Sequence, residues 1–346
     1  MQALTGGTTN AVFRCSKPGG TNRTVLLRSY GKGTEMYFSR ESELKAVQLL
    51  AQRGLGPAVL ATFEDGRVEE FLDGRALHAK DMRRPEISTV IARRLAELHA
   101  LDLDGVDRDP LIFRTLEDFH RKALDLCGDS LGGVDIVELG VIIARLRRRL
   151  EQGVPSKRVF CHNDLQPGNI MYNIFSTGST SDGGSESGRI GVAAPPIPTA
   201  ATSPPAALPV ARVCLIDYEY SGYNPRGFDL GNHFCEWMAD YEQAEPHLLD
   251  LEKYPSAEEK RRFCRAYLGA TLAVPDTDVS LDETESLVSE ADAYSLASHL
   301  LWGLWALLQS KSGAAAPGFD YVKYAAERVT AYRHFVGQLL PAAATS

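Results

Sequence analysis

Two polar segments, each directly after a short apolar run, constrain the fold of this chain most. The strand-like run Arg158–Cys161 leads into Asp164, and the run Val213–Ile216 leads into Asp217. Between them, residues 176–209 consist mostly of Gly, Ser, Thr, Ala and Pro. Such a composition buries too little apolar surface to become ordered, so we predict a disordered insertion that lengthens a surface hairpin turn. The two acidic segments are expected to converge in space.

The N-terminal part of the chain predicts a small, mostly β unit that carries one helix. Val25–Arg28 is a strand candidate, and Ser39–Arg53 has apolar residues along one helical face. Two further strand candidates, Ala58–Phe63 and Arg67–Phe71, are joined by a turn that contains a glycine. We assign this N-lobe to residues 1–73.

The remainder of the chain, residues 74–346, predicts a larger and mainly helical C-lobe. Ile87, Ile91, Leu95 and Leu98 form one apolar stripe at helical spacing. The other helical candidates span residues 137–150, 261–272, 291–309 and 321–335. The fold class expected from this order is α+β, with two lobes of unequal size.

Composition excludes several kinds of protein. The formal charge of −8 over 346 residues argues against a general nucleic-acid binder, because phosphate backbones favour basic surfaces. The six cysteines include no C-x-x-C pair, so reduced thiols are expected rather than a disulfide framework or a zinc site.

No targeting segment or membrane span is expected either. The first residues have neither a basic region nor an apolar run, which argues against a signal peptide. The longest apolar run, Leu296–Leu308, contains His299 and is too short to cross a bilayer. We therefore expect a cytoplasmic enzyme.

The first polar segment has the spacing H-x-D-x-x-x-x-N, through His162, Asp164 and Asn169. This spacing is typical of the catalytic loop of kinases, where the Asp orients or accepts the hydroxyl proton of the acceptor and the Asn binds Mg²⁺. Asp217, at the end of an apolar strand, is the expected second metal ligand. The alternative is that Asp164 and Asp217 only cap turns.

The N-lobe is expected to bind the nucleotide. The candidate phosphate loop comprises Gly7, Thr8, Thr9 and Asn10 after Gly6, although a simple turn is as good an interpretation. Arg28 on the following strand occupies the place of a phosphate-binding lysine, and Glu43 on the next helix is its expected partner. A solvated helix face is the alternative for Glu43. Glu70 lies in a segment that the order of elements places at the adenine hinge.

The wider motifs resemble the choline/ethanolamine kinase family. The resemblance rests on Cys161–Asp164, on Ile216–Asn224 and on Arg226–Met238, and extends to most of the chain outside the insertion. It implies a protein-kinase-like two-lobe fold, MgATP as donor and an amino alcohol as acceptor.

The resemblance also implies roles for individual residues. Asp164 is the implied catalytic base with Gln166 as a polar helper, and Asn169 and Asp217 are the implied Mg²⁺ ligands. Glu219 and Glu236 are the two carboxylates that the resemblance places near the substrate and the metal. The implied choline pocket consists of aromatic side chains, namely Tyr220, Tyr241, Trp302, Trp305, Tyr321 and Tyr324.

Such a pocket is also chemically reasonable. Trp302 and Trp305 are three residues apart on a predicted helix and share a face, as do Tyr321 and Tyr324. A trimethylammonium group has no N–H to donate, so aromatic faces and a diffuse negative field bind it well. From the residues alone, core packing would be the better interpretation of these aromatic pairs.

Other residues are expected to be structural. His99 is interpreted as a packed helix residue, His162 and His233 as braces of their motifs, and Cys235 as a small buried side chain.

The leading hypothesis is phosphorylation of choline, with ethanolamine as a side substrate, to give phosphocholine for phospholipid synthesis. The alternatives are an ethanolamine-selective kinase and a pseudokinase that binds without catalysis. The resemblance also allows a homodimer.

Overall fold

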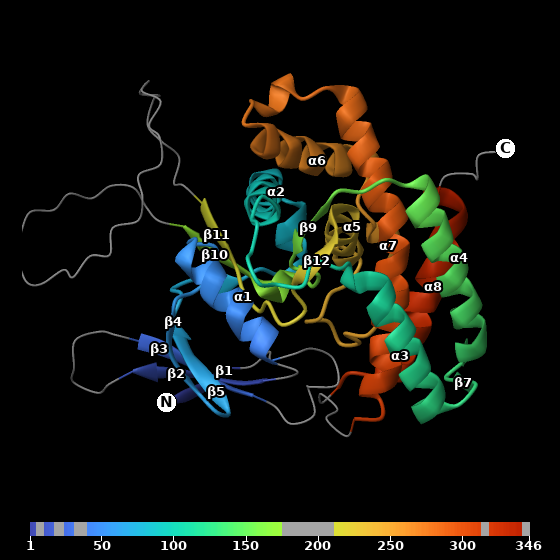
Figure 1. Ribbon diagram of the computed structural model, residues 1–346, viewed down its shortest axis with the longest axis horizontal. Helices are drawn as coiled ribbons and strands as arrows, with labels where there is room; N and C mark the ends of the chain where they lie inside the picture. The colour runs from blue at the N-terminus through green and yellow to red at the C-terminus, as the bar shows by residue number, and fades with distance from the viewer. Residues whose placement is uncertain (5–9, 17–23, 31–39, 175–210, 313–317, 341–346) are drawn as a thin grey trace, which may run out of the picture.

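The computed structural model describes residues 1–4, 10–16, 24–30, 40–174, 211–312 and 318–340. A small sheet with one helix lies at one end of the molecule, and helices form most of the rest (Figure 1). This arrangement confirms the expected α+β fold with a β-rich first lobe and a mainly helical second lobe. The exact lobe boundary at residues 73 and 74 stays a prediction.

The N-terminal sheet is antiparallel, with the strand order β1-β2-β3-β5-β4. Its strands are β1 (Gln2–Leu4), β2 (Asn10–Ser16), β3 (Thr24–Tyr30), β4 (Val59–Phe63) and β5 (Gly66–Glu70). The three strands predicted in this region correspond to β3, β4 and β5. Strands β1 and β2 were not predicted, because their short and mixed sequences lack a clear apolar alternation and depend on pairing with β3.

Helix α1 (Arg40–Gln52) connects the sheet to the larger lobe. Its buried residues Val47 and Leu50 belong to the same apolar cluster as Ile91 and Leu95 of α2 (Pro85–His99). The predicted stop is confirmed, since the helix is followed by Gly54 with a φ of +70°. Glycine adopts this left-handed conformation without steric cost.

The larger lobe contains most of the helices. They are α2, α3 (Leu111–Cys127), α4 (Ile136–Gly153), α5 (Arg226–Glu236), α6 (Ala257–Leu272), α7 (Leu281–Gln309) and α8 (Tyr321–Leu339), with the 3-10 helices η2 (Ala79–Arg83), η3 (Pro167–Asn169), η4 (Leu251–Lys253) and η5 (Asp276–Asp278). Helix α7 packs against α3, α5 and α8 (Figure 1). Helix α3 was not predicted, and α7 begins at Leu281 rather than Ala291 because Ser280 caps it by accepting from Glu283 N.

Short strand pairs frame the polar segments. β9 (Arg158–Cys161) pairs with β12 (Gly222–Pro225). β10 (Ile170–Ile174) pairs antiparallel with β11 (Ala211–Leu215) on one side and with β6 (Arg75–Ala76) on the other. A separate pair consists of β7 (Ser130–Leu131) and β8 (Val134–Asp135). Ile174 lies opposite Ala211, so the hairpin predicted around the insertion is confirmed. The insertion itself lies outside the described residues.

The part of the chain that the structure describes contains no helix that is both long and apolar enough to cross a membrane.

The contact between α5 and α7 requires a glycine. A Cβ on Gly231 would lie 2.4 Å from Ala291 O and 2.6 Å from Ser295 N, both backbone atoms. We expect Gly231→Ala to lower the free energy of unfolding by about 1–3 kcal/mol, because the helices must move apart. Urea denaturation measures this change.

The matched control is Gly337→Ala in α8, where a Cβ would have no neighbour within 4 Å. This substitution should raise the free energy of unfolding by about 0.5–1 kcal/mol, since alanine is the better helix former. Equal effects of the two substitutions would contradict the close approach of α5 to α7.

Candidate active site

The loop after β9 turns sharply at Asn163, directly before Asp164. Asn163 has a φ of 68°, a conformation that Asn tolerates better than most residues. Its amide Nδ2 donates to Tyr220 O at 2.9 Å, and its Oδ1 accepts from Asn224 Nδ2 at 2.8 Å. These bonds hold the turn in one conformation and connect the first polar segment to the second.

A buried carboxylate on α5 binds the backbone of this turn. Asp229 accepts from His162 N at 2.7 Å and from Asn163 N at 2.8 Å. His99 Nε2 lies 3.0 Å from Asp229 Oδ2, and the other ring nitrogen of His99 lies 2.9 Å from Tyr267 OH. His99 is therefore a packed structural residue, as predicted, but it acts by orienting Asp229. Sequence analysis did not single out Asp229.

His99, Cys161 and Asp229 also have the mutual spacing of a metal site. Burial raises the pKa of the Cys161 thiol well above its usual range, and the charge of Asp229 acts in the same direction. A thiol that holds its proton is a poor metal ligand, and the Asp229 oxygens already accept hydrogen bonds. The group is therefore interpreted as structural.

Asp164 and Asn169 contact each other within the loop. Asn169 Nδ2 donates to Asp164 Oδ2 and to Asp164 O, both at 2.9 Å. This leaves the amide oxygen of Asn169 as the atom that can accept a metal. Gln166, the predicted polar helper, uses its Oε1 to cap η3 by accepting from Gly168 N at 3.2 Å.

The two polar segments converge as predicted. The ladder between β10 and β11 extends beyond the strands, because Ile216 N donates to Asn169 O at 3.0 Å. His162 Nε2 also donates to Ile216 O at 2.9 Å. Asp217 follows with a φ of 66°, so the backbone turns at this carboxylate as well. Asn169 and Asp217 are thereby held at neighbouring positions of one hairpin.

Negative charge is concentrated around Asp164. Burial raises the pKa of Asp164 well above its usual range, and the charges of Glu236, Asp217 and Glu219 raise it further. Such mutual repulsion requires that these carboxylates lie near one another. The site is therefore prepared to bind positive charge, whether from a metal ion or from a cationic substrate.

The N-lobe contributes arginines to the edge of this acidic site. Arg28 Nη1 donates to Asp217 Oδ1 at 2.9 Å, and Arg28 Nε lies 3.6 Å from Glu69 Oε1. Burial works to lower the pKa of Arg28, but Asp217 and Glu69 together with Glu43 raise it above its usual value. Arg28 therefore remains a cation beside a predicted metal ligand.

Glu43, the expected partner of Arg28, raises the pKa of Arg28 by its charge and also bonds a second arginine. Glu43 Oε1 accepts from Arg67 Nη1 at 2.7 Å, and Arg67 also donates to Glu69. Arg67 is 1% exposed and is fully charged in this setting, because Glu69 and Glu43 raise its pKa against the effect of burial. Glu43 thus serves a network of two arginines, and the solvated alternative for Glu43 is excluded by its burial.

The structure describes only some of the other residues that were predicted to bind the nucleotide. Asn10 is buried and donates from Nδ2 to Glu219 Oε2 at 3.2 Å, which places the start of β2 beside the second polar segment. Gly7, Thr8 and Thr9 lie outside the described residues. Glu70 N donates to Ala58 O at 2.8 Å, so this N–H is not free to bind adenine.

The six predicted aromatic residues gather beside Glu236. Ring centroids of Tyr220 and Trp302 lie 5.3 Å apart, those of Trp302 and Trp305 lie 5.5 Å apart, and those of Trp305 and Tyr321 lie 5.7 Å apart. Phe319 contacts both Tyr321 and Tyr324 and was missed by sequence analysis. We call Tyr220, Tyr241, Trp302, Trp305, Phe319, Tyr321 and Tyr324 the aromatic cluster.

Hydrogen bonds fix the orientation of both indoles. Trp302 Nε1 donates to Asn232 Oδ1 at 2.7 Å, and Trp305 Nε1 donates to Tyr220 OH at 2.9 Å. The cluster is continuous with the core between α7 and α8, so its rings also serve packing. One link to the acidic site is Tyr241, whose hydroxyl donates to Glu236 Oε2 at 2.7 Å.

The remaining structural predictions are confirmed. Burial lowers the pKa of His162 and of His233, so both rings are neutral. His162 Nδ1 accepts from Asp164 N at 3.3 Å, and His233 Nδ1 donates to Leu165 O at 2.9 Å. The two rings brace the catalytic loop through these bonds. Cys235 is fully buried in the core.

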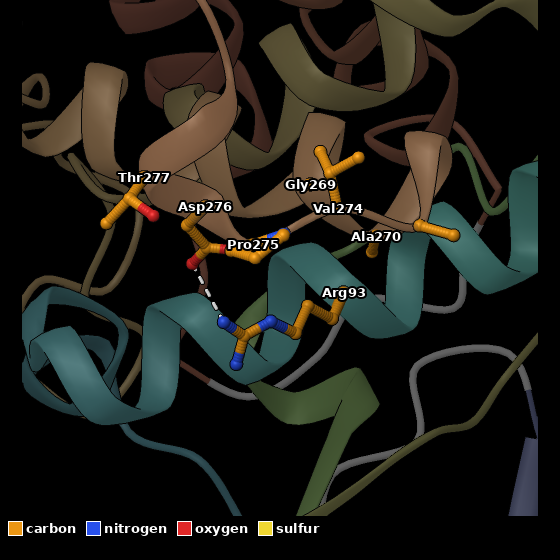
Figure 2. Close-up of a pocket in the computed structure, with 8 residues that line it drawn as sticks. Arg93, Gly269, Ala270, Val274, Pro275, Asp276 and Thr277 are labelled. Carbon is orange, nitrogen blue, oxygen red and sulfur yellow. Dashed lines mark hydrogen bonds and ion pairs between the residues drawn. The ribbon is translucent and has the colours of Figure 1, made fainter. Parts of the chain in front are cut away.

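A hollow of about 480 Å³ lies elsewhere, between α2 and the end of α6. Figure 2 shows Arg93 extending from α2 toward Asp276 of η5, with an ion pair of 2.8 Å between them. None of its lining residues belongs to the acidic site or the aromatic cluster. The hollow is therefore separate from the acidic site.

The anchor at Asp229 yields a stability prediction. Burial works to raise the pKa of Asp229, but its hydrogen bond and charge interaction with His99 leave it below the ordinary value of 3.8. A depressed folded-state pKa adds stability above the unfolded-state value, and this stability is lost as the pH falls through the folded-state value. Asp229→Asn should therefore cost about 2–4 kcal/mol at pH 7.

Urea denaturation across pH measures this cost. The difference between wild type and Asp229→Asn should shrink as the pH falls below ~4, because the carboxyl of the unfolded chain then becomes protonated before that of the folded protein. The exposed Asp104 provides the control Asp104→Asn, which should change little at any pH. A cost that does not depend on pH would show that the charge of Asp229 is not what anchors the loop.

Comparisons with known proteins agree with this site. A family model described as choline/ethanolamine kinase matches residues 1–333. A probable choline kinase 3 of Arabidopsis thaliana is 34% identical, over 96% of this chain and 85% of its own length. A choline/ethanolamine kinase of Homo sapiens is 33% identical, over 97% of this chain and 80% of its own length.

A solved structure shows the same fold. The choline kinase of Cryptosporidium parvum aligns with a TM-score of 0.74 at 24% identity, over 98% of this chain and 89% of that chain. The family model, the relatives and the convergent acidic loops together show that this chain is an enzyme of the choline/ethanolamine kinase family.

Proposed function

We propose that this protein transfers the γ-phosphoryl group of ATP to the hydroxyl of choline, and less efficiently to that of ethanolamine. The observation that carries this proposal is the contact between a carboxylate-rich site around Asp164 and the aromatic cluster, through Tyr241 and Glu236. The first element suits phosphoryl transfer, and the second suits a quaternary ammonium group. The relatives named as choline kinases support the same substrate class.

The nucleotide would lie between the sheet and the larger lobe. Arg28 is the described cation nearest to Asp217, and it would pair with phosphate oxygens at the edge of the metal site. The network of Arg67 with Glu43 and Glu69 holds the inner face of α1 against the sheet. Arg28 would therefore approach the nucleotide from a rigid strand, at little entropic cost.

The oxygen donors of the site fit magnesium. Asn169 has its amide oxygen available because its nitrogen is engaged by Asp164, and Asp217 offers a carboxylate on the adjoining strand end. Mg²⁺ prefers such oxygen ligands, and when bound it neutralises phosphate charge. Asn169 and Asp217 are the proposed ligands.

Asp164 would act on the hydroxyl of the acceptor. The choline oxygen forms a bond to the γ-phosphorus while the bond from that phosphorus to the β–γ bridging oxygen breaks, and the hydroxyl proton passes to Asp164. Asn169 holds Asp164 in place by donating to its Oδ2. The products are phosphocholine and ADP, and catalysis consists mostly of positioning and charge neutralisation.

Removing the base tests this assignment. Asp164→Ala should retain ATP binding but lose at least about 10²-fold in kcat, the scale of general-base effects. A coupled assay of ADP release with choline, with ethanolamine and with no acceptor measures the rates, and nucleotide titration measures binding. Near-normal turnover in Asp164→Ala would remove this residue from its proposed role.

Truncating an indole tests the acceptor site. Trp302→Leu should raise KM for choline roughly tenfold and leave KM for ATP unchanged, because a cation–π contact is lost. Phe335→Leu is the control, since Phe335 is a buried aromatic residue on α8 that contacts Tyr254 and His299. It should reduce stability without changing KM for choline. The proposal would be wrong if both variants changed KM for choline equally.

A further inference from the structure

A buried arginine lies behind the aromatic cluster. The side chain of Arg328 on α8 has 0% exposure, and its Nη2 donates to Glu236 Oε1 at 2.6 Å. Nε and Nη2 also donate to Tyr324 OH, at 2.9 and 2.5 Å. The motif patterns gave no signal for this residue, because its partner lies on a distant helix.

Arg328 keeps its positive charge in this setting. Burial works to lower its pKa, but Tyr324 and Glu236 raise that pKa well above the usual value. A buried guanidinium and a buried carboxylate at 2.6 Å form a pair whose net charge is zero. Arg328 therefore offsets part of the negative field that Glu236 presents to the aromatic cluster.

The hydrogen-bonding capacity of Glu236 is also partly used. Oε1 accepts from Arg328, and Oε2 accepts from Tyr241 OH at 2.7 Å. Tyr241 in turn lies beside Tyr324, with their hydroxyl oxygens 3.4 Å apart. Each carboxylate oxygen of Glu236 thus already accepts a hydrogen bond from a protein donor.

This arrangement affects two kinds of ammonium group differently. A primary ammonium carries three N–H donors, and burying them without acceptors costs free energy. A trimethylammonium has no N–H and spreads its charge over methyl groups, so aromatic faces satisfy it. A site whose carboxylate is already paired and hydrogen-bonded therefore penalises the primary ammonium more.

We propose that Arg328 is a specificity-determining residue, which favours a quaternary over a primary ammonium substrate by engaging Glu236 from behind the aromatic cluster. This inference rests on the proposed function of the site. Arg328 need not touch the substrate, because it acts through Glu236, the carboxylate that Tyr241 of the cluster contacts. Tyr241 contributes to the same effect from the other oxygen of Glu236.

The test compares acceptors that differ only in N-methylation. We would measure kcat/KM for ethanolamine, N-methylethanolamine, N,N-dimethylethanolamine and choline in wild type, Arg328→Met, Arg328→Lys and Tyr241→Phe. Arg328→Met removes the positive charge and the N–H donors but keeps a side chain of similar length. Arg328→Lys keeps the positive charge. Circular dichroism and thermal denaturation report whether each variant is folded.

We expect Arg328→Met to raise the ratio of ethanolamine to choline kcat/KM at least about tenfold, because a charged acceptor becomes available to the substrate. The gain should decrease with each added methyl group. Tyr241→Phe should raise the same ratio about threefold, and Arg328→Lys should remain within about threefold of wild type.

A common fall in kcat/KM for all four acceptors in Arg328→Met and Tyr241→Phe would overturn the specificity role and leave Arg328 a packing residue. If Arg328→Met does not fold, an unchanged ratio in Tyr241→Phe overturns the role by itself. Wild-type protein that phosphorylates none of the acceptors would instead contradict the proposed function.

Discussion

Asp229 is a buried carboxylate whose oxygens accept from two consecutive backbone N–H groups, those of His162 and Asn163. A backbone turn with a left-handed Asn is costly unless its donors are satisfied, and Asp229 satisfies both. Asp164 follows this turn directly, so the position of the proposed base depends on a residue of α5. His99 secures Asp229 in turn, which connects the reactive loop to α2. The catalytic loop is therefore held by the packed core of the larger lobe.

Charge balance is the second constraint on this molecule. Carboxylates surround Asp164 closely enough to raise its pKa, while Arg28 reaches Asp217 from the N-lobe sheet. Such an arrangement is electrostatically unfavourable by itself and becomes favourable when cations and phosphates bind together. Beside it, the pair of Glu236 and Arg328 contains its own counter-charge. One half of the site is therefore acidic and attracts positive charge. The other half consists of aromatic rings and the Glu236–Arg328 ion pair, whose net charge is zero.

Sequence reasoning succeeded where the chemistry is encoded in short spacing. The loop that holds Asp164 and Asn169 lies beside the turn at Asp217, as predicted, and the tryptophan pair lies on α7, while their catalytic and binding roles stay proposals. It failed for α3, whose residues the pattern analysis passed over, and for β2, which depends on pairing with β3. It did not predict that Glu43 also bonds Arg67, which comes from a strand that sequence order does not place beside α1.

Local spacing by itself predicted the reaction class, because a carboxylate and an amide at this separation on one loop are typical of kinases, and the family match agrees with that prediction. Helices α2, α4 and α8 followed from apolar periodicity, because the backbone brings residues i and i+4 to the same helical face. Only the tertiary structure decided which charged side chains pair with one another. Asp229 accepts from the backbone of the loop, and Arg67 donates to Glu43. Arg328 donates to Glu236, which lies 92 residues away in the sequence. Ion pairs in a buried setting form between whichever side chains packing brings together, and no periodicity in the chain records that choice.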